Sequence, residues 1–84
     1  MVTTREDISL WLEKGKKQRD ITHMLVVCDT YEYEDYPVYV SLNQNVHDVF
    51  NSYDKKNMQR VMEVYSYRQN LKTQLEQERV FNFD

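Results

Sequence analysis

The chain has very little cysteine, glycine or proline. It contains one of each, Cys28, Gly15 and Pro37, among 84 residues. A single cysteine excludes an intrachain disulfide, and a single glycine excludes a glycine-rich phosphate-binding loop. So few glycines and prolines also argue against a flexible linker or a disordered chain. We therefore expect one folded domain, residues 1–84, because a chain this short has no room for a second core.

Long apolar runs and an excess of basic residues are also missing. No apolar stretch approaches the roughly 20 residues of a membrane-spanning helix, and no signal-peptide pattern is present. The formal net charge of −3 indicates neither DNA nor an anionic membrane as a partner. A cytoplasmic location fits the lone Cys28, which falls in an apolar stretch and is expected to be buried and unreactive.

The stretch from Thr22 to Leu42 organises the rest of the chain. An apolar run rich in β-branched residues predicts a buried strand over residues 22–29. Alternation of apolar and polar side chains predicts a second strand over residues 37–42, with one face on a core. The connection between them is both acidic and rich in tyrosine, too polar for a core and too aromatic for an ordinary turn.

Helical spacing of apolar residues predicts three helices, at residues 4–18, 46–53 and 69–79. Thr3 with Glu6 forms a capping-box pattern at the first helix, and Asn45 is a good N-cap for the second. Gly15 falls on the apolar stripe of the first helix, where it would let that helix approach the sheet closely.

Residues 58–67 fit both a helix and a strand. Their β-branched and aromatic content favours a strand, with Val61, Glu63, Tyr65 and Tyr67 on one face. The apolar tail Val80, Phe81, Phe83 either docks on the core or meets another subunit. The resulting fold class is α+β: a small antiparallel three-stranded sheet with helices mainly on one face, in the order αββαβα. The short chain and its apolar tail predict a homo-oligomer.

No arrangement of side chains indicates catalysis or metal binding. The carboxylates Asp29, Glu32, Glu34 and Asp35 match no calcium loop and lack its glycine, so a solvated hairpin end that discourages edge pairing is favoured. His23 and His47 have no second ligand at zinc spacing, and no serine stands in a nucleophile motif. We therefore predict a protein that is not an enzyme and has no cofactor and no metal site.

The tyrosines are the positive signal, since seven occur in 84 residues. A tyrosine offers a flat ring for a nucleobase and a hydroxyl for a phosphate, while arginine binds phosphate. The same tyrosines could instead cover a half-exposed sheet or contact another protein. The candidate ligand-binding residues are Tyr31, Tyr33, Tyr36, Tyr39, Arg60, Tyr65, Tyr67 and Arg68.

Three strings carry a family resemblance: THMLVVCDTYEYEDYPVYV at residues 22–40, NMQRVMEVYSY at 57–67 and QLEQERVF at 74–81. Together they resemble a widespread family of small accessory proteins encoded by tailed bacteriophages and prophages. The family pattern has a glycine after the first helix, where this chain has Arg19 and Asp20. The resemblance implies a phage protein that acts in the cytoplasm of a host bacterium, and small phage proteins of this kind often act against host defence.

Two functions follow as hypotheses. The first is a non-enzymatic anti-defence protein that sequesters a nucleotide-derived immune signal of the cyclic oligonucleotide or cyclic ADP-ribose type. It rests on the tyrosines and arginines and on an analogy with compact, catalytically inert phage proteins that sequester such signals. The alternative is a phage protein that binds and inhibits a host protein through its acidic, tyrosine-rich surface.

Overall fold

The computed structural model describes residues 3–84 and confirms the α+β class and the predicted order of elements. Along the chain these are α1 (Arg5–Lys16), β1 (Ile21–Asp29), β2 (Glu34–Ser41), α2 (Val46–Tyr53), β3 (Gln59–Ser66) and α3 (Leu71–Leu75). The three strands form one antiparallel sheet in the order β2-β1-β3. The ambiguous segment 58–67 is therefore a strand, as its β-branched residues indicated.

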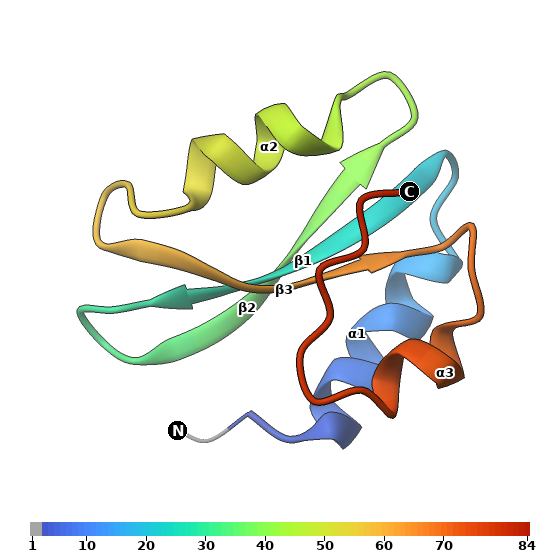
Figure 1. Cartoon of the computed structure of the whole chain (residues 1–84), viewed down its shortest axis with the longest axis horizontal. Coiled ribbons are helices and arrows are strands. Elements are labelled where there is room, and N and C mark those ends of the chain that lie inside the picture. Colours follow the sequence, from blue (N-terminus) through green and yellow to red (C-terminus); the bar gives the residue numbers. More distant parts are fainter. Residues whose placement is uncertain (1–2) are drawn as a thin grey trace.

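Both faces of the sheet are covered, although more helix lies on one of them (Figure 1). On one face, α1 and α3 pack over side chains that include Met24, Val26 and Tyr65. On the other, α2 packs over Leu25, Val27 and their neighbours. β1 runs through the middle, so its residues 23–27 are all buried. A strand covered on both faces reads as a continuous apolar run, which explains the sequence of β1.

Local signals set where α1 begins and ends. The N-cap is Thr4, whose side chain accepts a hydrogen bond from the Asp7 amide while the Asp7 carboxylate accepts one from the Thr4 amide. The predicted capping box was therefore one residue too early. α1 ends at Lys16, and the connection to β1 closes at Asp20 with a φ of 61°. This left-handed conformation is one that glycine adopts most easily.

Gly15 allows two tyrosines to reach the backbone of α1. The hydroxyl of Tyr39 donates to the Trp11 carbonyl at 2.7 Å, and that of Tyr67 donates to the Leu12 carbonyl at 2.8 Å. A Cβ atom at position 15 would lie 2.5 Å from Cε1 of Tyr39 and would collide with the Tyr67 hydroxyl. The prediction that Gly15 permits close approach to the sheet is confirmed.

A β-bulge in β3 changes which of its side chains share a face. Glu63 lies opposite Val26, but Val61 lies opposite Val27, so Met62 is the extra residue. Glu63 and Tyr65 face α1, whereas Val61 packs with Val64 under α2. The prediction that Val61 shares a face with Glu63 is wrong, because strict alternation does not continue through a bulge.

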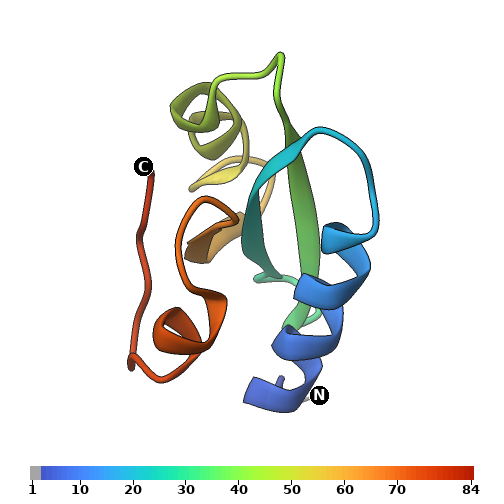
Figure 2. The same cartoon turned by 90° about the vertical axis from the view of Figure 1, so that its right-hand side faces the viewer.

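The C-terminal segment docks on the outer edge of β3 instead of extending the last helix. α3 has five residues instead of the predicted eleven positions 69–79, although Leu71 and Leu75 do share its apolar face. Val64 donates its amide to the Val80 carbonyl at 2.7 Å and accepts from the Asn82 amide at 3.0 Å. Figure 2 shows this segment running along the outside of the molecule beside β3. The tail therefore covers an edge that would otherwise be open to another chain.

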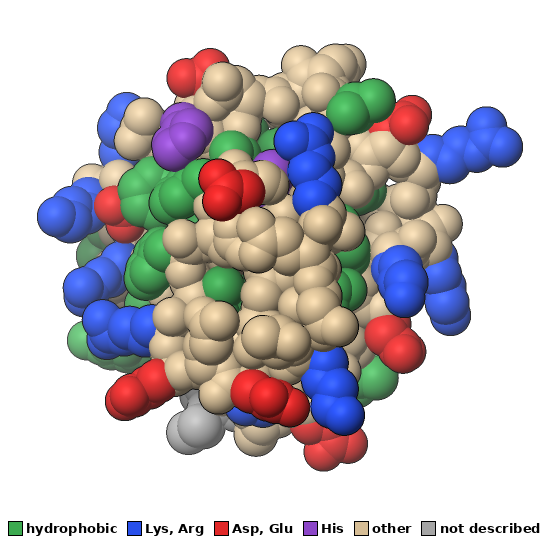
Figure 3. All heavy atoms as spheres, turned by 45° about the vertical axis from the view of Figure 1, so that its right-hand side comes forward, with side chains coloured by type: hydrophobic (Ala, Val, Ile, Leu, Met, Phe, Trp, Pro, Cys, Tyr) green, Lys and Arg blue, Asp and Glu red, His purple; other side chains and the backbone are tan. Residues whose placement is uncertain are grey.

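His23 and two phenylalanines hold the end of this tail. His23 is 4% exposed, and its Nε2 donates to the Phe83 carbonyl at 3.2 Å. The Phe83 ring stacks on His47 with centroids 4.5 Å apart and meets Phe50 edge-on. On the face drawn in Figure 3, an exposed histidine lies beside a group of hydrophobic side chains. Val80 and Phe83 pack against their own chain, whereas Phe81 is 47% exposed. Most of the tail is therefore docked, and the homo-oligomer stays a prediction.

We expect Gly15→Ala to destabilise the fold by about 1–3 kcal/mol, which is the usual penalty for overpacking. Glycine-to-alanine changes inside helices normally stabilise, so the expected sign is the opposite of the helix-propensity effect. Urea unfolding followed by circular dichroism measures the change. Lys14→Ala, at an exposed position of the same helix, should change stability by less than about 0.5 kcal/mol. A Gly15→Ala protein as stable as the parent would contradict the close contact.

We also expect stability to fall as the pH drops below about 6.5. Burial lowers the pKa of His23 from its ordinary value of 6.5, so the unfolded chain takes up a proton there before the folded one does. The stability is therefore complete above the unfolded pKa and is lost as the pH falls below it. Urea unfolding between pH 7.5 and 5 should show this decrease, and His23→Gln should reduce it. His47→Gln leaves His23 in place and should retain it.

Candidate functional site

Three of the predicted ligand-binding tyrosines belong to the core. Tyr65 is completely buried, and Tyr39 and Tyr67 are half-buried with their hydroxyls bonded to α1. Burial is the main cause that raises the pKa of all three hydroxyls. Of the three uses left open by the sequence, sheet cover describes these tyrosines, and the ring of Tyr65 is not available to a ligand in this conformation.

The predicted arginines are not brought together around one ligand. Arg60 lies near the start of β3, whereas Arg68 lies beyond its end, in the turn toward α3. The six steps of strand from Arg60 to Ser66 correspond to about 20 Å. Tyr36 lies on the α2 face, where its hydroxyl accepts a hydrogen bond from the Gln59 side chain. The eight predicted site residues therefore do not form one site, although Tyr39, Tyr65 and Tyr67 lie together under α1.

A groove beside Tyr67 is the place closest to the predicted nucleotide chemistry. It holds about 480 Å³ and is lined by Lys16 and Lys72 as well as by Tyr67, and Gly15 and Asp20 also border it. The last turn of α1 ends here, and carbonyl groups at a helix C-terminus disfavour an anion. The helix dipole already explains why lysines occur near that end of α1, so they are not evidence of an anion site.

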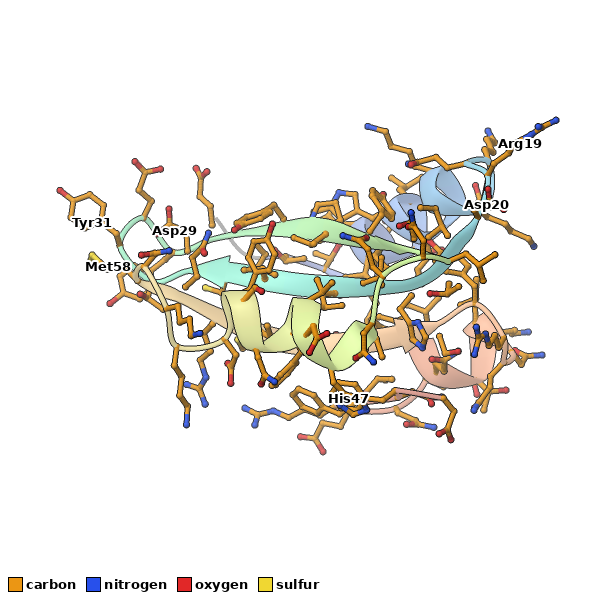
Figure 4. The ribbon with its side chains drawn as sticks, turned by 90° about the horizontal axis from the view of Figure 1, so that it is seen from above. Arg19, Asp20, Asp29, Tyr31, His47 and Met58 are labelled. Atoms are coloured by element: carbon orange, nitrogen blue, oxygen red, sulfur yellow. The ribbon has the colours of Figure 1, made fainter. Side chains whose placement is uncertain are left out.

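Tyr31 and Tyr33 are the exposed tyrosines of the predicted set, and the fold adds Met58 to them. Both tyrosines are 72% exposed and Met58 is 59% exposed. Tyr31 and Tyr33 lie in the β1–β2 loop, and Met58 lies in the turn before β3. Figure 4 shows Tyr31 and Met58 at the same end of the molecule, opposite the end that carries Arg19 and Asp20. We call residues 30–33 with residues 55–58 the tip.

Hydrogen bonds join the two halves of the tip. The amide and the hydroxyl of Thr30 both donate to the Met58 carbonyl, at 2.8 and 2.7 Å. The Asp29 carboxylate accepts from the Tyr31 amide at 2.9 Å, and the Asp29 carbonyl accepts from the Tyr33 amide at 2.6 Å. Positive φ angles occur on both sides, 56° at Tyr33 and 59° at Met58. The exposed side chains are therefore presented by a bonded backbone.

Carboxylates and cations lie on different sides of the tip. Glu32 and Glu34 are exposed on the hairpin, with Asp29 and Asp35 partly exposed beside them. On the β3 side lie the exposed Lys55, Lys56 and Arg60. In Figure 4, side chains ending in oxygen extend to one side of this end of the sheet, and side chains ending in nitrogen extend to the other. Within residues 3–84 the single ion pair is Arg5–Glu63, so the carboxylates of the tip are not paired.

Cys28 lies behind the tip rather than deep in the core. It is half-buried, opposite Asp35 on β2 and Arg60 on β3. The prediction that Cys28 is buried is wrong, because β1 extends past the helix that covers its other end. Burial and the neighbouring Asp35 carboxylate raise the pKa of the Cys28 thiol, which disfavours the reactive thiolate.

Comparison of the chain with protein-family models, with curated proteins and with solved structures finds no match. The phage resemblance therefore stays a prediction. In the part of the chain that the structure describes, no three His, Cys, Asp or Glu side chains are grouped as a metal site would require. Over the same residues, no helix has the length and apolar character needed to cross a bilayer.

The contribution of Met58 was missed at the level of sequence. It follows the polar segment Asp54 to Asn57 and opens the stretch that the sequence favours as a strand, where nothing in the spacing marks its side chain. Its position beside Tyr31 depends on the pairing of β1 with both other strands. The acidic and aromatic composition of residues 29–36 did indicate the other half of the tip.

Replacing tyrosine by phenylalanine should separate the two groups of tyrosines. Tyr67→Phe removes the hydrogen bond to the Leu12 carbonyl and leaves that acceptor to its helical partner alone, so we expect a loss of about 0.5–1.5 kcal/mol of stability. Tyr31→Phe and Tyr33→Phe remove exposed hydroxyls and should stay within about 0.5 kcal/mol of the parent. Thermal and urea unfolding measure both. Equal losses in the two groups would contradict the assignment of Tyr67 to the core.

Proposed function

We propose that this protein is a non-enzymatic binding protein that takes a protein partner at its tip. This is the second of the two functions expected from the sequence, in which a phage protein binds and inhibits a host protein. The observation that supports it is the exposure of three large apolar side chains, Tyr31, Tyr33 and Met58, on adjoining loops. Aromatic residues and methionine are enriched where proteins meet.

The lack of any stabilising role for these exposed side chains supports the same function. Tyrosine and methionine in water stabilise nothing in the isolated domain, whereas burying apolar area contributes about 25 cal/mol per Å². The remaining tyrosines show that the chain readily uses such rings for packing when a helix is available. An apolar centre with charged neighbours is the usual arrangement of a binding surface, with charge placed at the rim.

Sequestration of a nucleotide-derived signal receives less support from the geometry. It requires an aromatic face and arginines around one ligand. Tyr65 is buried, Arg60 and Arg68 are at different ends of β3, and the groove beside Tyr67 adjoins a helix C-terminus. Calorimetric titration with cyclic oligonucleotides and cyclic ADP-ribose is the direct test of this first hypothesis.

The protein-binding function is tested by site-specific photo-crosslinking. A photoreactive phenylalanine derivative at position 31 should form a discrete crosslink to one bacterial protein, which mass spectrometry identifies. The same group at position 10 is the matched control. Leu10 is also an exposed apolar residue, 60% exposed, but it lies on α1 and not at the tip, so no discrete crosslink is expected there. The identified partner, once purified, should bind the wild-type protein in calorimetry.

Charge reversal at the rim supplies the second control. Glu32→Lys with Glu34→Lys should abolish the crosslink from position 31, since rim charges guide association. Reversal of exposed charges elsewhere, as in Lys14→Glu, should leave it unchanged. Equal crosslinking from positions 10 and 31, or crosslinks that survive the reversal at the rim, would exclude the tip as the binding surface.

A further inference from the structure

We propose that the tip recognises arginine side chains, so that its partner presents an arginine-rich segment. This inference rests on the proposed protein-binding function and names the chemistry of the partner. Its basis is the alternation of aromatic rings and carboxylates in residues 29–36, DTYEYEDY. Within this stretch the side chains of residues 31–34, two tyrosines and two glutamates, are all exposed.

A guanidinium group has two chemical requirements that the tip meets side by side. Its flat, weakly hydrated face stacks on an aromatic ring, and its N–H edge forms paired hydrogen bonds with a carboxylate. Tyr31 and Tyr33 supply the ring faces, and Glu32 and Glu34 supply carboxylates from the positions next to them. A lysine ammonium meets only part of this demand, because it is compact, strongly hydrated and cannot form a planar two-bond pair.

The groups that would contact an arginine are free to do so. Glu32 and Glu34 are exposed, and in the region the structure covers the ion pair is formed by Arg5 and Glu63 instead. The hydroxyl groups of the half-buried Tyr39 and Tyr67 are bonded to α1, but the rings of Tyr31 and Tyr33 are open to solvent. The loop backbone is held by the Asp29 carboxylate and by Thr30, which limits the ordering that binding would require.

The cations on the β3 side orient the partner. Lys55 and Lys56 lie in the turn that continues into Met58 and would repel a basic segment lying across them. The partner is therefore expected on the β2 side of the tip. Opposite charges on the two sides of the tip would also suit a second copy of this chain. Binding of an arginine-rich partner and binding of a second copy respond differently to the loss of Lys55 and Lys56.

The test is calorimetric titration of the full chain with a hexa-arginine peptide at low salt, with hexa-lysine as the comparison. We expect hexa-arginine to bind more tightly than hexa-lysine, which has the same charge. One cation–π contact at an exposed site is worth about 0.5–1 kcal/mol. Tyr31→Leu with Tyr33→Leu removes two such contacts and should weaken binding by roughly 5- to 30-fold. Tyr31→Phe with Tyr33→Phe keeps both rings and should bind within about two-fold of the parent.

A variant with the opposite expected effect completes the test. Lys55→Glu with Lys56→Glu should tighten hexa-arginine binding, whereas a tip occupied by a second copy would show self-association in light scattering that this variant weakens. Equal affinity for the two peptides, or no change on losing both rings, overturns the arginine assignment. Specific crosslinking from position 31 together with that result would leave the protein-binding function standing, so the two failures are distinguishable.

Discussion

One ion pair, between the exposed Arg5 and the buried Glu63, connects parts of the chain that are far apart in sequence. Arg5 at the start of α1 donates to both oxygens of Glu63 at 2.9 and 3.0 Å and to the Tyr65 hydroxyl at 2.7 Å. Its other terminal nitrogen donates to the carbonyls of Gln77 and Glu78, at 2.7 Å each. Helix α1, strand β3 and the C-terminal segment therefore meet at one guanidinium group. Glu63 is 7% exposed, and a buried carboxylate without partners would be strongly unfavourable.

The β-bulge is what makes this pair possible. Without the extra residue Met62, either Val61 or Glu63 would be on the wrong face of β3 for the packing observed. With it, Val61 stays in the apolar layer under α2 while Glu63 turns toward Arg5. The Val80 amide and the Tyr65 hydroxyl also donate to Glu63, so its carboxylate is well satisfied. The same bulge thus sets the position of the tail, which covers the outer edge of β3.

The periodicity of apolar residues was sufficient to predict the helices and strands, but not the contacts between them. The apolar run of β1, the stripe of α1 and the role of Gly15 depend on local spacing, and each was predictable. The bulge, the shortness of α3 and the docking of the tail depend on residues more than ten positions apart, such as Arg5 with Glu63 and Val64 with Val80. For the tyrosines, alternation gives the face of the sheet but not which helix covers that face. Tyr39 and Tyr67 lie under α1, while Tyr31 and Tyr33, in the acidic and aromatic connection that precedes the strand of Tyr39, remain exposed.

The backbone of the tip gives a physical reason why its apolar side chains do not fold back onto the domain. Tyr33, Asn57 and Met58 all have positive φ angles, 56°, 52° and 59°, and each such residue other than glycine costs of order 1 kcal/mol or more. The two Thr30 hydrogen bonds to the Met58 carbonyl hold this arrangement across the two loops. The strain and the exposure are therefore two consequences of one backbone geometry, which presents the rings in a fixed orientation and lowers the ordering entropy that a partner must overcome.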